Sequence, residues 1–367
     1  MSPDKRPLVV KFGGSSFATP GAYAQLAHAL DARIAGSGRR LAVVVSAMPG
    51  ETERLRERLH EVNPRPTGAR VAGMLTLADT VSAQLLAAAL QRLGRGATVL
   101  VGHETGFTTT DTFMWAGLER IAPEPLRRAL AEHEVVVVPG GQAVDGLGRP
   151  TWLGKNSSDL SAVATAVALG ASACEIHSDV HGIHSCDPHR IDGTRLLDQV
   201  AYDDAATMSR HGAKVLHHRA VRLAQQHGVT IRCRHNKAPF TQGTVIGPGG
   251  PSASAVVLNL RSRVLDYPDP AAADRAHRAF RADGVETLRL PDGPQVAVIG
   301  GYVDAEETQL RHGVTPGRPC GFPVTVLHED RTAVHTAADE PAAVRLAQHL
   351  HDELALSEEQ LLPTSAV

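Results

Sequence analysis

LVVKFGGSS, residues 8–16, joins a short run of apolar residues to a glycine turn. Three other valine-rich runs that end in glycine follow it along the chain, at 41–50, 97–106 and 135–141. Segments that are apolar on consecutive positions are typical of strands buried on both faces of a parallel sheet. The repeated pattern therefore predicts four strands that share one sheet.

The longer stretches between these runs have helical spacing. In residues 22–36 and 75–94, apolar side chains recur every three or four positions, which predicts one buried stripe on each helix. The predicted stripes consist of Leu26, Ala29, Leu30 and Ile34 in the first helix, and of Leu77, Val81, Leu85, Ala88 and Leu93 in the second. Strands alternating with helices predict an α/β fold, a three-layer αβα sandwich with a mainly parallel central sheet.

The alternation continues to residue 234 and then gives way to a linker. Helices are predicted at 158–170, 203–212 and 217–228, and strands at 173–180 and 229–234. Residues 239–254 then carry four glycines and three prolines, which is typical of a connecting segment. We therefore divide the chain into a first domain over 1–247 and a smaller α+β domain over 248–367.

The second domain has a mixed order of strands and helices. Strands are predicted at 255–265, 286–291, 295–301 and 322–330, and helices at 271–284, 305–313 and 341–356. In the last helix, Val344, Ala347, Leu350 and Leu354 form one stripe, which predicts a core face.

Composition excludes several classes of protein. The chain has 367 residues, enough for two domains, and its 37 basic and 39 acidic residues give a net charge of -2. No global field attracts nucleic acid or an acidic membrane surface, and no run approaches the roughly 20 consecutive apolar residues of a membrane span. Four scattered cysteines and no apolar targeting stretch indicate a cytoplasmic protein with reduced thiols.

The first glycine turn is the leading candidate for a phosphate site. Lys11, Gly13, Gly14, Ser15 and Ser16 combine a cation with backbone N–H groups that no Cβ shields. The alternative is an ordinary strand-to-helix turn. The standard P-loop spacing G-x-x-x-x-G-K-[ST] is missing from the sequence, so a P-loop is excluded.

Six motifs support a more specific interpretation. They are KFGGSS (11–16), VVVSAMPGETERL (43–55), GFTTTDTF (106–113), VVVVPGGQAVDGLGRPTWLGKNSSD (135–159), SDVHGIHSCDP (178–188) and GAKVLHHRAV (212–221). In order and spacing, they resemble the aspartate kinases of the amino acid kinase family, over about residues 8–247. The resemblance implies ATP-dependent transfer of a phosphoryl group to the side-chain carboxylate of L-aspartate, with Mg²⁺ brought by ATP.

The resemblance also implies roles for individual residues. Lys11 would stabilise the transferring γ-phosphoryl group, and Asp159 would organise the catalytic cations. The implied nucleotide-binding residues are Gly13, Gly14, Ser178, Asp179, His184 and Lys214. The implied substrate-binding residues are Ser15, Ser46, Asp79 and Lys155. Physical chemistry agrees with the first pair, because phosphoryl transfer is catalysed mainly by positioning and by positive charge on the equatorial oxygens.

The sequence departs from the family pattern chiefly at the acceptor pocket. Lys155 stands where an arginine is expected to bind the substrate α-carboxylate, and a lysine cannot make the same bidentate contact. Ala78-Asp79 replaces Gly-Glu, which shortens the side chain expected to face the substrate amine. On the nucleotide side, His184 and His189 replace a tyrosine and an arginine. Two alternatives therefore stay open: a kinase for another small carboxylate or phosphonate, and an inactive regulatory homologue.

A histidine-rich stretch raises the question of a metal site. Its candidate ligands are Cys174, His177, His181, His184, Cys186 and His189. Strand alternation turns Cys174 and His177 to opposite faces, so the first ligands would diverge. We therefore expect no protein-bound zinc.

The second domain resembles the ACT modules of these kinases, which have the element order βαββαβ. At about 115 residues it is long for one module and short for two. We expect it to mediate homodimerisation, either as a regulatory domain or as an assembly domain that binds no effector. No nucleic-acid or membrane partner is expected.

Overall fold

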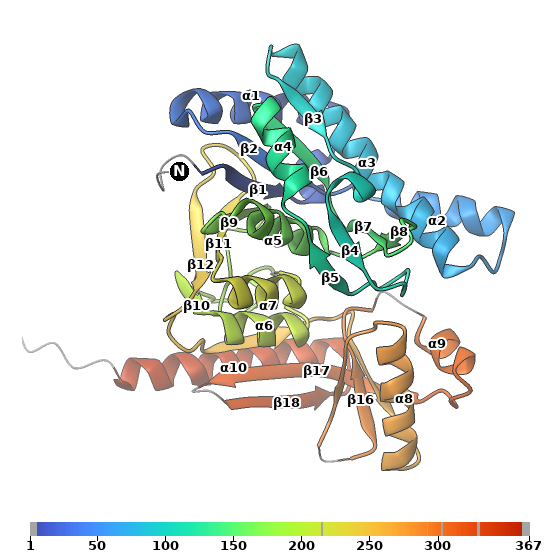
Figure 1. The fold of residues 1–367 in the computed structure, drawn as a ribbon. Helices are drawn as coiled ribbons and strands as arrows, with labels where there is room; N and C mark the ends of the chain where they lie inside the picture. The colour runs from blue at the N-terminus through green and yellow to red at the C-terminus, as the bar shows by residue number, and fades with distance from the viewer. Residues whose placement is uncertain (1–5, 214–215, 292, 302–303, 329–330, 362–367) are drawn as a thin grey trace, which may run out of the picture. The chain divides into compact units, whose positions relative to one another are not determined.

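The computed structural model describes residues 6–213, 216–291, 293–301, 304–328 and 331–361 (Figure 1). The chain divides into two compact units, Met1–Gly182 with Arg219–Pro248, and Ile183–His218 with Gly249–Val367. The third and last crossing between the units, at Pro248/Gly249, lies one residue from the predicted boundary at 247/248. Residues 183–218, which the prediction placed in the first domain, pack with the residues from 249 onward.

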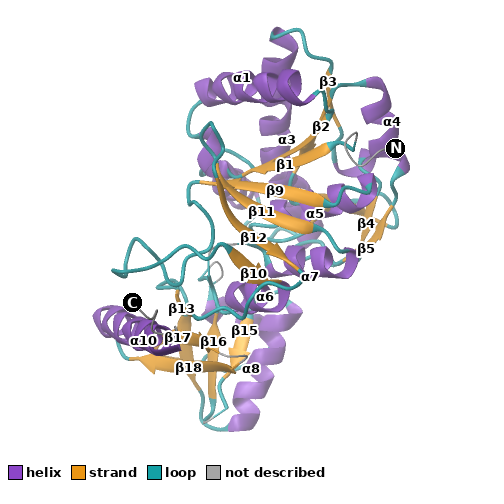
Figure 2. Cartoon of the chain, turned by 90° about the vertical axis from the view of Figure 1, so that its left-hand side faces the viewer, coloured by secondary structure: helices purple, strands orange, loops and turns teal. Residues whose placement is uncertain are grey.

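The first unit is built around a mainly parallel sheet (Figure 2). Its strands lie in the order β12 (Gln242–Gly247), β11 (Thr230–His235), β9 (Ala173–Ser178), β1 (Leu8–Phe12), β2 (Leu41–Val45), β6 (Val135–Pro139) and β3 (Ala97–Val99). Neighbours pair in parallel except β12, which is antiparallel to β11. The four glycine-ended runs form β1, β2, β3 and β6, so the prediction that they share one sheet is confirmed.

Helices cover both faces of this sheet. On one face, α1 (Pro20–Ser37) and α3 (Gly68–Arg92) pack against Val10 and Phe12 of β1 and the equivalent residues of β2 and β6. On the other face lie α4 (Glu124–Glu132) and α5 (Ser158–Leu169). α7 (His218–His227) precedes β11. The arrangement confirms the three-layer αβα sandwich.

The predicted stripe of α1 is correct, but that of α3 is wrong. Leu26, Leu30 and Ile34 of α1 are buried. In α3, Leu77, Val81 and Leu85 are exposed, and of the predicted stripe Leu93 packs against the core. A different set is buried: Leu75, Ala78, Ser82, Ala83, Leu86 and Leu90. α3 is apolar on more than one face, so periodicity alone did not identify the buried one.

The sequence patterns missed several short elements of the first unit. They are α2 (Glu51–Val62), the 3-10 turns at Gly14–Phe17 and Gly102–Glu104, and a small sheet of β4 (Phe107–Thr109), β5 (Leu118–Ile121), β7 (Gln142–Asp145) and β8 (Pro150–Trp152). The predicted linker also contains β12, whose central residues are buried. Short strands with few apolar residues give little periodic signal.

The second unit contains an antiparallel sheet with helices packed against it. The antiparallel sheet consists of β13 to β18. The elements of the whole unit are β10 (Gln199–Ala201), α6 (Tyr202–Arg210), β13 (Ala255–Leu258), β14 (Arg263–Asp266), α8 (Pro270–Ala282), β15 (Thr287–Arg289), β16 (Gln295–Val298), α9 (Ala305–Arg311), β17 (Arg318–His328), β18 (Arg331–Ala337) and α10 (Glu340–Leu361). From β14 to β17 the order is βαββαβ, and the strands lie in the order β17-β14-β16-β15, all antiparallel. This is the ACT-like arrangement that the sequence predicted.

Three details of the second unit correct the prediction. The strand predicted at 255–265 is two strands, because a turn at Asn259–Ser262 separates β13 from β14. β18 was not predicted, since its alternating residues are mostly exposed. Residues 183–191 contribute Cys186 and Ile191 to the core under α10. That core also holds Ala347 and the partly buried Val344, Leu350 and Leu354, which confirms the predicted core stripe.

Candidate active site

The first pair of predicted catalytic residues forms a buried ion pair. Alternation along β1 turns Val10 and Phe12 toward α1 and α3, and Lys11 toward α5. Lys11 Nζ lies 2.7 Å from Asp159 Oδ1 in the first turn of α5, and the two side chains are 11% and 8% exposed. The structure thus brings together, at the carboxyl end of β1, two residues that are far apart in the sequence.

The glycine turn leaves open backbone beside this pair. A Cβ at Gly14 would lie 2.9 Å from the carbonyl oxygen of Ala47, and one at Gly13 would lie 3.4 Å from Lys11 Nζ. The backbone N–H of Gly13 donates to the carbonyl of His177 over 3.3 Å, which ties the turn to β9. Close approach therefore requires glycine at position 14, whereas a Cβ at position 13 would make only ordinary van der Waals contacts. The turn presents backbone next to a cation.

The start of α5 is packed tightly against the ends of two strands. Ser46, which follows β2, shares a hydrogen bond with Ser158 over 2.8 Å between the hydroxyl oxygens. A Cβ at Gly140, which follows β6, would lie only 2.4 Å from Ser158 Cβ. Gly140 and Ser158 were not predicted as site residues, yet they hold the helical turn that carries Asp159.

Asp79 lies in the same region, on the buried side of α3. Its Oδ1 accepts a 3.0 Å hydrogen bond from the backbone N–H of Ala47. Burial raises the pKa of Asp79 to about 7, although this hydrogen bond and the charge of Lys11 oppose the shift. A carboxyl group with this pKa changes charge near neutral pH.

Lys155 lies in the loop between β8 and α5. Its Nζ pairs with Glu53 Oε1 of α2 over 2.9 Å, with side chains 37% and 50% exposed. Burial opposes ionisation of Glu53, but the hydrogen bond and charge of Lys155 lower the Glu53 pKa below its ordinary value. The next residue, Asn156, has φ of 60°, a left-handed conformation that asparagine tolerates better than most residues. Glu53 was not predicted as a partner.

A partly buried arginine supports this loop. Arg219 of α7 donates through Nη1 to the carbonyl of Leu153 (3.0 Å) and through Nη2 to that of Ala116 (2.6 Å). Burial lowers the pKa of Arg219. It belongs to the last of the six motifs, but the sequence gave no indication of what it contacts.

Asn236, directly after the end of β11, is another unpredicted residue that contacts the glycine turn. The Asn236 amide donates to the hydroxyls of Ser15 (3.2 Å) and Ser16 (3.3 Å), and its backbone N–H donates to the carbonyl of Ser178 (2.7 Å). The hydroxyl of Ser178 is engaged within its own turn, with Val180, and Asp179 is exposed. Among the predicted nucleotide residues, Gly13, Gly14 and Ser178 therefore lie around neighbouring strand ends.

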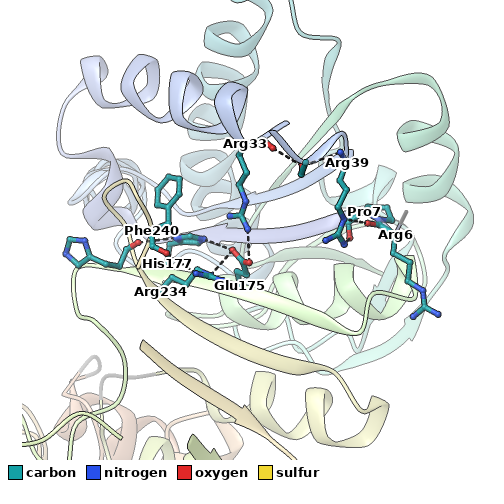
Figure 3. A network of polar contacts seen from close by, with 10 residues as sticks. Arg6, Pro7, Arg33, Arg39, Glu175, His177, Arg234 and Phe240 are labelled. Carbon is teal, nitrogen blue, oxygen red and sulfur yellow. Dashed lines mark hydrogen bonds and ion pairs between the residues drawn. The ribbon is translucent and has the colours of Figure 1, made fainter. Parts of the chain in front are cut away.

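A network of charges beneath the turn fixes β9 (Figure 3). Glu175 binds Arg33 of α1 (2.7 Å) and Arg234 of β11 (3.2 Å), and it also contacts His177 (3.3 Å). Burial disfavours the Glu175 carboxylate, but His177 and the two arginines outweigh it and lower the pKa to about 2. Burial also lowers the pKa of His177, whose ring stacks on Phe12 and donates to the carbonyl of His235. The network joins α1, β9 and β11 directly beside β1.

His184 and Lys214 are the two other predicted nucleotide residues. His184 lies in the second unit, where it forms an isolated β-bridge with Leu196. Lys214 lies outside the described residues. In the part of the chain that the structure describes, no three His, Cys, Asp or Glu side chains gather as a metal-binding group.

Comparison with known proteins identifies the family. The model of the amino acid kinase family matches residues 6–235. An aspartokinase of Thermus thermophilus is 37% identical over 242 residues, covering 65% of this chain and 58% of the relative. An aspartokinase of Mycobacterium tuberculosis is 36% identical over 304 residues, covering 82% and 68%. The chain thus spans a little over half the length of the first of these relatives.

Solved structures agree on the fold. Escherichia coli aspartokinase III in complex with aspartate and ADP gives a TM-score of 0.65 at 20% identity, with 87% of each chain covered. Aspartate kinase from Synechocystis gives 0.56 at 27% identity, covering 87% of this chain and 60% of that one. The chain therefore belongs to the amino acid kinase family and, within it, to the aspartokinases.

Proposed function

We propose that this protein transfers the γ-phosphoryl group of ATP to the side-chain carboxylate of L-aspartate, giving 4-phospho-L-aspartate. The observation that carries the proposal is the buried Lys11–Asp159 pair beside a glycine turn in a chain of the aspartokinase family. The relatives at 36% and 37% identity are aspartokinases, and a buried cation beside a glycine turn suits a transferring phosphoryl group, which supports the proposal. Because the chain spans only part of those relatives, the activity is a proposal for this chain.

In the proposed mechanism, Lys11 stabilises the phosphoryl group as it transfers. Asp159 holds the Lys11 ammonium at a fixed position in a largely water-free site, where a positive charge acts more strongly than in bulk water. The backbone of Gly13 and Gly14 lies beside the phosphates, with no side chain in the way. Ser178 and Asp179 are proposed to border the nucleotide.

The residues present suit a magnesium ion that arrives with ATP. Mg²⁺ in phosphoryl-transfer sites is usually held by one or two carboxylates together with substrate phosphates. Asp159 supplies a buried carboxylate next to the proposed phosphate position. When bound, the ion would neutralise charge on the phosphate oxygens. The proposed role of Asp159 is to hold the Mg²⁺ ion and the Lys11 ammonium in place.

The acceptor is proposed to lie between Ser15, Ser46, Asp79 and Lys155. Asp79 offers an acceptor for the substrate ammonium, and Lys155 a cation for its α-carboxylate. Since Glu53 already pairs with Lys155, a bound carboxylate would have to displace or share that partner. The Lys155–Glu53 pair is partly exposed and therefore weak, so displacing Glu53 costs little free energy.

A coupled assay of ADP release, run over a panel of amino acids and small carboxylic and phosphonic acids, tests the proposal. L-aspartate is expected to give the highest kcat/KM in the panel. Turnover of another acid in preference to aspartate would overturn the proposed substrate but not the phosphoryl transfer. No ADP release with any acceptor, from correctly folded protein, would overturn both.

The acceptor pocket gives a prediction about substrate affinity. Changing Lys155→Arg together with Asp79→Glu should raise kcat/KM for aspartate by roughly tenfold, because arginine binds a carboxylate through two parallel hydrogen bonds and glutamate reaches further. The KM for ATP serves as the control and should stay unchanged. A fall in kcat/KM for aspartate would mean that the native pocket has already compensated for its shorter residues.

Asp79 gives a prediction about pH. Since its pKa is about 7, the fraction of Asp79 present as the carboxylate that would bind the substrate ammonium increases as pH rises from 6 to 8, so KM for aspartate should fall over this range. The pKa of Asp79 in the folded protein lies above the ordinary value of 3.8. This group therefore also makes the free energy of unfolding decrease as pH rises from 3.8 to about 7. Steady-state kinetics and thermal unfolding measure the two effects. Asp79→Asn should abolish both pH dependences, and their persistence in that variant would assign them to another group.

We also propose a cytoplasmic homodimer that associates through the second unit. The ACT-like sheet of β14 to β17 supports this assignment. The net charge of -2 supports the absence of a nucleic-acid partner.

A further inference from the structure

The loop between β4 and β5 places an aromatic ring directly on the backbone that precedes Lys155. A Cβ at Gly154 would lie 2.4 Å from Cε3 and from Cζ3 of the Trp115 ring, so this position has room for glycine alone. Gly154 belongs to the short loop between β8 and α5. The Trp115 indole therefore covers the residue next to the proposed substrate-binding lysine.

Hydrogen bonds and a cation hold this ring in place. The N–H of Ala116 donates to the carbonyl of Trp152 (3.0 Å), and the N–H of Trp152 donates to the carbonyl of Phe113 (2.8 Å). Arg219 joins the two segments that meet at the ring, because it donates to the carbonyls of Ala116 and Leu153. Its guanidinium carbon lies 6.0 Å from the centre of the indole, at the outer range of a cation–π contact. The indole is thus fixed by its own loop, by β8 and by α7.

The loop that carries Lys155 depends on such support. Gly154 and Asn156, on either side of the lysine, both have left-handed backbone, with φ of 106° and 60°. The hydroxyl of Ser157 donates to the carbonyl of Gly154 over 2.5 Å and closes the loop. The contact of the Lys155 side chain with Glu53 is partly exposed and gives little stabilisation. The place of the ammonium therefore depends on how firmly the loop backbone is held.

Trp115 contributes to this backbone contact more than to the core. Among the residues that the structure describes, the apolar core beside the loop does not include Trp115, which is partly exposed. That core consists of Val71, Ala72, Leu75 and Trp152, with Leu59, Phe113 and Met114 packed against it. The neighbouring side chains of the loop thus face the core, while the Trp115 ring faces Gly154.

We propose that Trp115 is a positioning residue for the acceptor, which fixes the Gly154 backbone and thereby the place of the Lys155 ammonium. The inference rests on the proposed function, because it takes Lys155 as the cation that binds the substrate α-carboxylate. A lysine carries a compact charge on a flexible stem of four carbons, so its contribution depends on where its backbone is held. Trp115 acts through that backbone, so its loss should weaken binding of the amino acid and leave ATP binding unchanged.

Steady-state kinetics of the full chain test this role. Trp115→Ala should raise KM for aspartate by about tenfold, because a displaced binding group loses much of its contact with the substrate. Both kcat and KM for ATP should stay within about twofold of the wild type. Trp115→Phe keeps a ring on Gly154 and should recover most of the affinity. Met114→Ala is the matched control, since it shortens the neighbouring side chain, which packs against the core, and should leave KM for aspartate unchanged.

A double-mutant cycle connects the effect to the contact itself. Gly154→Ala should also raise KM for aspartate, because its methyl group would lie 2.4 Å from the Trp115 ring. In Trp115→Ala the methyl group meets no indole, so the double variant should show a smaller increase in KM than the product of the two single increases. The strain of alanine at φ of 106° is present in both backgrounds and cancels from the comparison. Gly154→Ala also tests the contact from the opposite side if Trp115→Ala does not fold.

The outcomes separate this inference from the proposed function. Unchanged KM for aspartate in Trp115→Ala or Gly154→Ala, an equal increase in Met114→Ala, or single effects that multiply in the double variant would each overturn the inference alone, since wild-type turnover of aspartate would still support the proposed function. A wild-type protein that releases no ADP with aspartate would overturn the proposed substrate and, with it, the role given to Trp115.

Discussion

Lys11→Ala is expected to lower kcat for phosphoryl transfer by about two to four orders of magnitude. The ammonium of Lys11 is fixed 2.7 Å from Asp159 and largely shielded from water, so it needs little reorganisation when charge moves between the phosphates and the acceptor. Its removal takes away an interaction that strengthens in the transition state. Because the loss is specific to the transition state, kcat should fall much more than the affinity for ATP changes. Fixed-time assays of ADP formation over a range of ATP concentrations measure the fall in kcat.

The same change also removes one partner of a buried ion pair, so loss of folding must be separated from loss of chemistry. Removing one partner of a buried ion pair while the charge of Asp159 stays costs about 3 to 5 kcal/mol of stability. Lys11→Ala combined with Asp159→Asn removes that charge and should recover much of the thermal stability without recovering turnover. Wild-type turnover in Lys11→Ala would remove the kinase proposal, and recovery of activity in the double variant would assign the defect to folding.

The sequence predicted the features that depend on local pattern. The runs at 8–12 and 135–139 are apolar except for Lys11 and are followed by glycine, and each forms a strand with a neighbour on both sides in the parallel sheet. Lys11 and Asp159 were found through motifs, and the strand-end position of one and the helix start of the other explain why they meet. The βαββαβ order of the second unit followed from the same spacing rules.

What the sequence missed depends on contacts between distant segments. Spacing shows which side chains of α3 share a face, but a helix that is apolar on several faces does not reveal which face meets the sheet. The spacing therefore predicted that Leu77, Val81 and Leu85, which are exposed, belong to the core. The contacts of Asn236 with Ser15, and of Arg219 with Leu153, join residues far apart in the chain. Polar residues near strand ends give no periodic signal, and only the packed fold defines their partners.

Gly140→Ala is expected to impair the enzyme although residue 140 would touch neither substrate. A methyl group there would lie 2.4 Å from Ser158 Cβ and 3.0 Å from the carbonyl oxygen of Val45, distances that force the start of α5 to move. Ser158 immediately precedes Asp159, so the shift reaches the Lys11–Asp159 pair. A displacement of about 1 Å in a catalytic group costs about a hundredfold in rate, and overpacking costs about 1 to 3 kcal/mol of stability.

Gly146→Ala is the matched control for this change, since it adds the same methyl group in the hairpin that follows. No atom lies within 4 Å of a Cβ at Gly146, and neither glycine has a positive φ, so backbone conformation does not distinguish the two positions. Steady-state kinetics and thermal unfolding should therefore show a loss for Gly140→Ala and wild-type values for Gly146→Ala. If both variants kept wild-type kcat and melting temperature, the contact between residue 140 and α5 would not be what positions Asp159. The contrast between two glycines six residues apart thus tests whether close packing at the helix start sets the geometry of the proposed phosphoryl-transfer site.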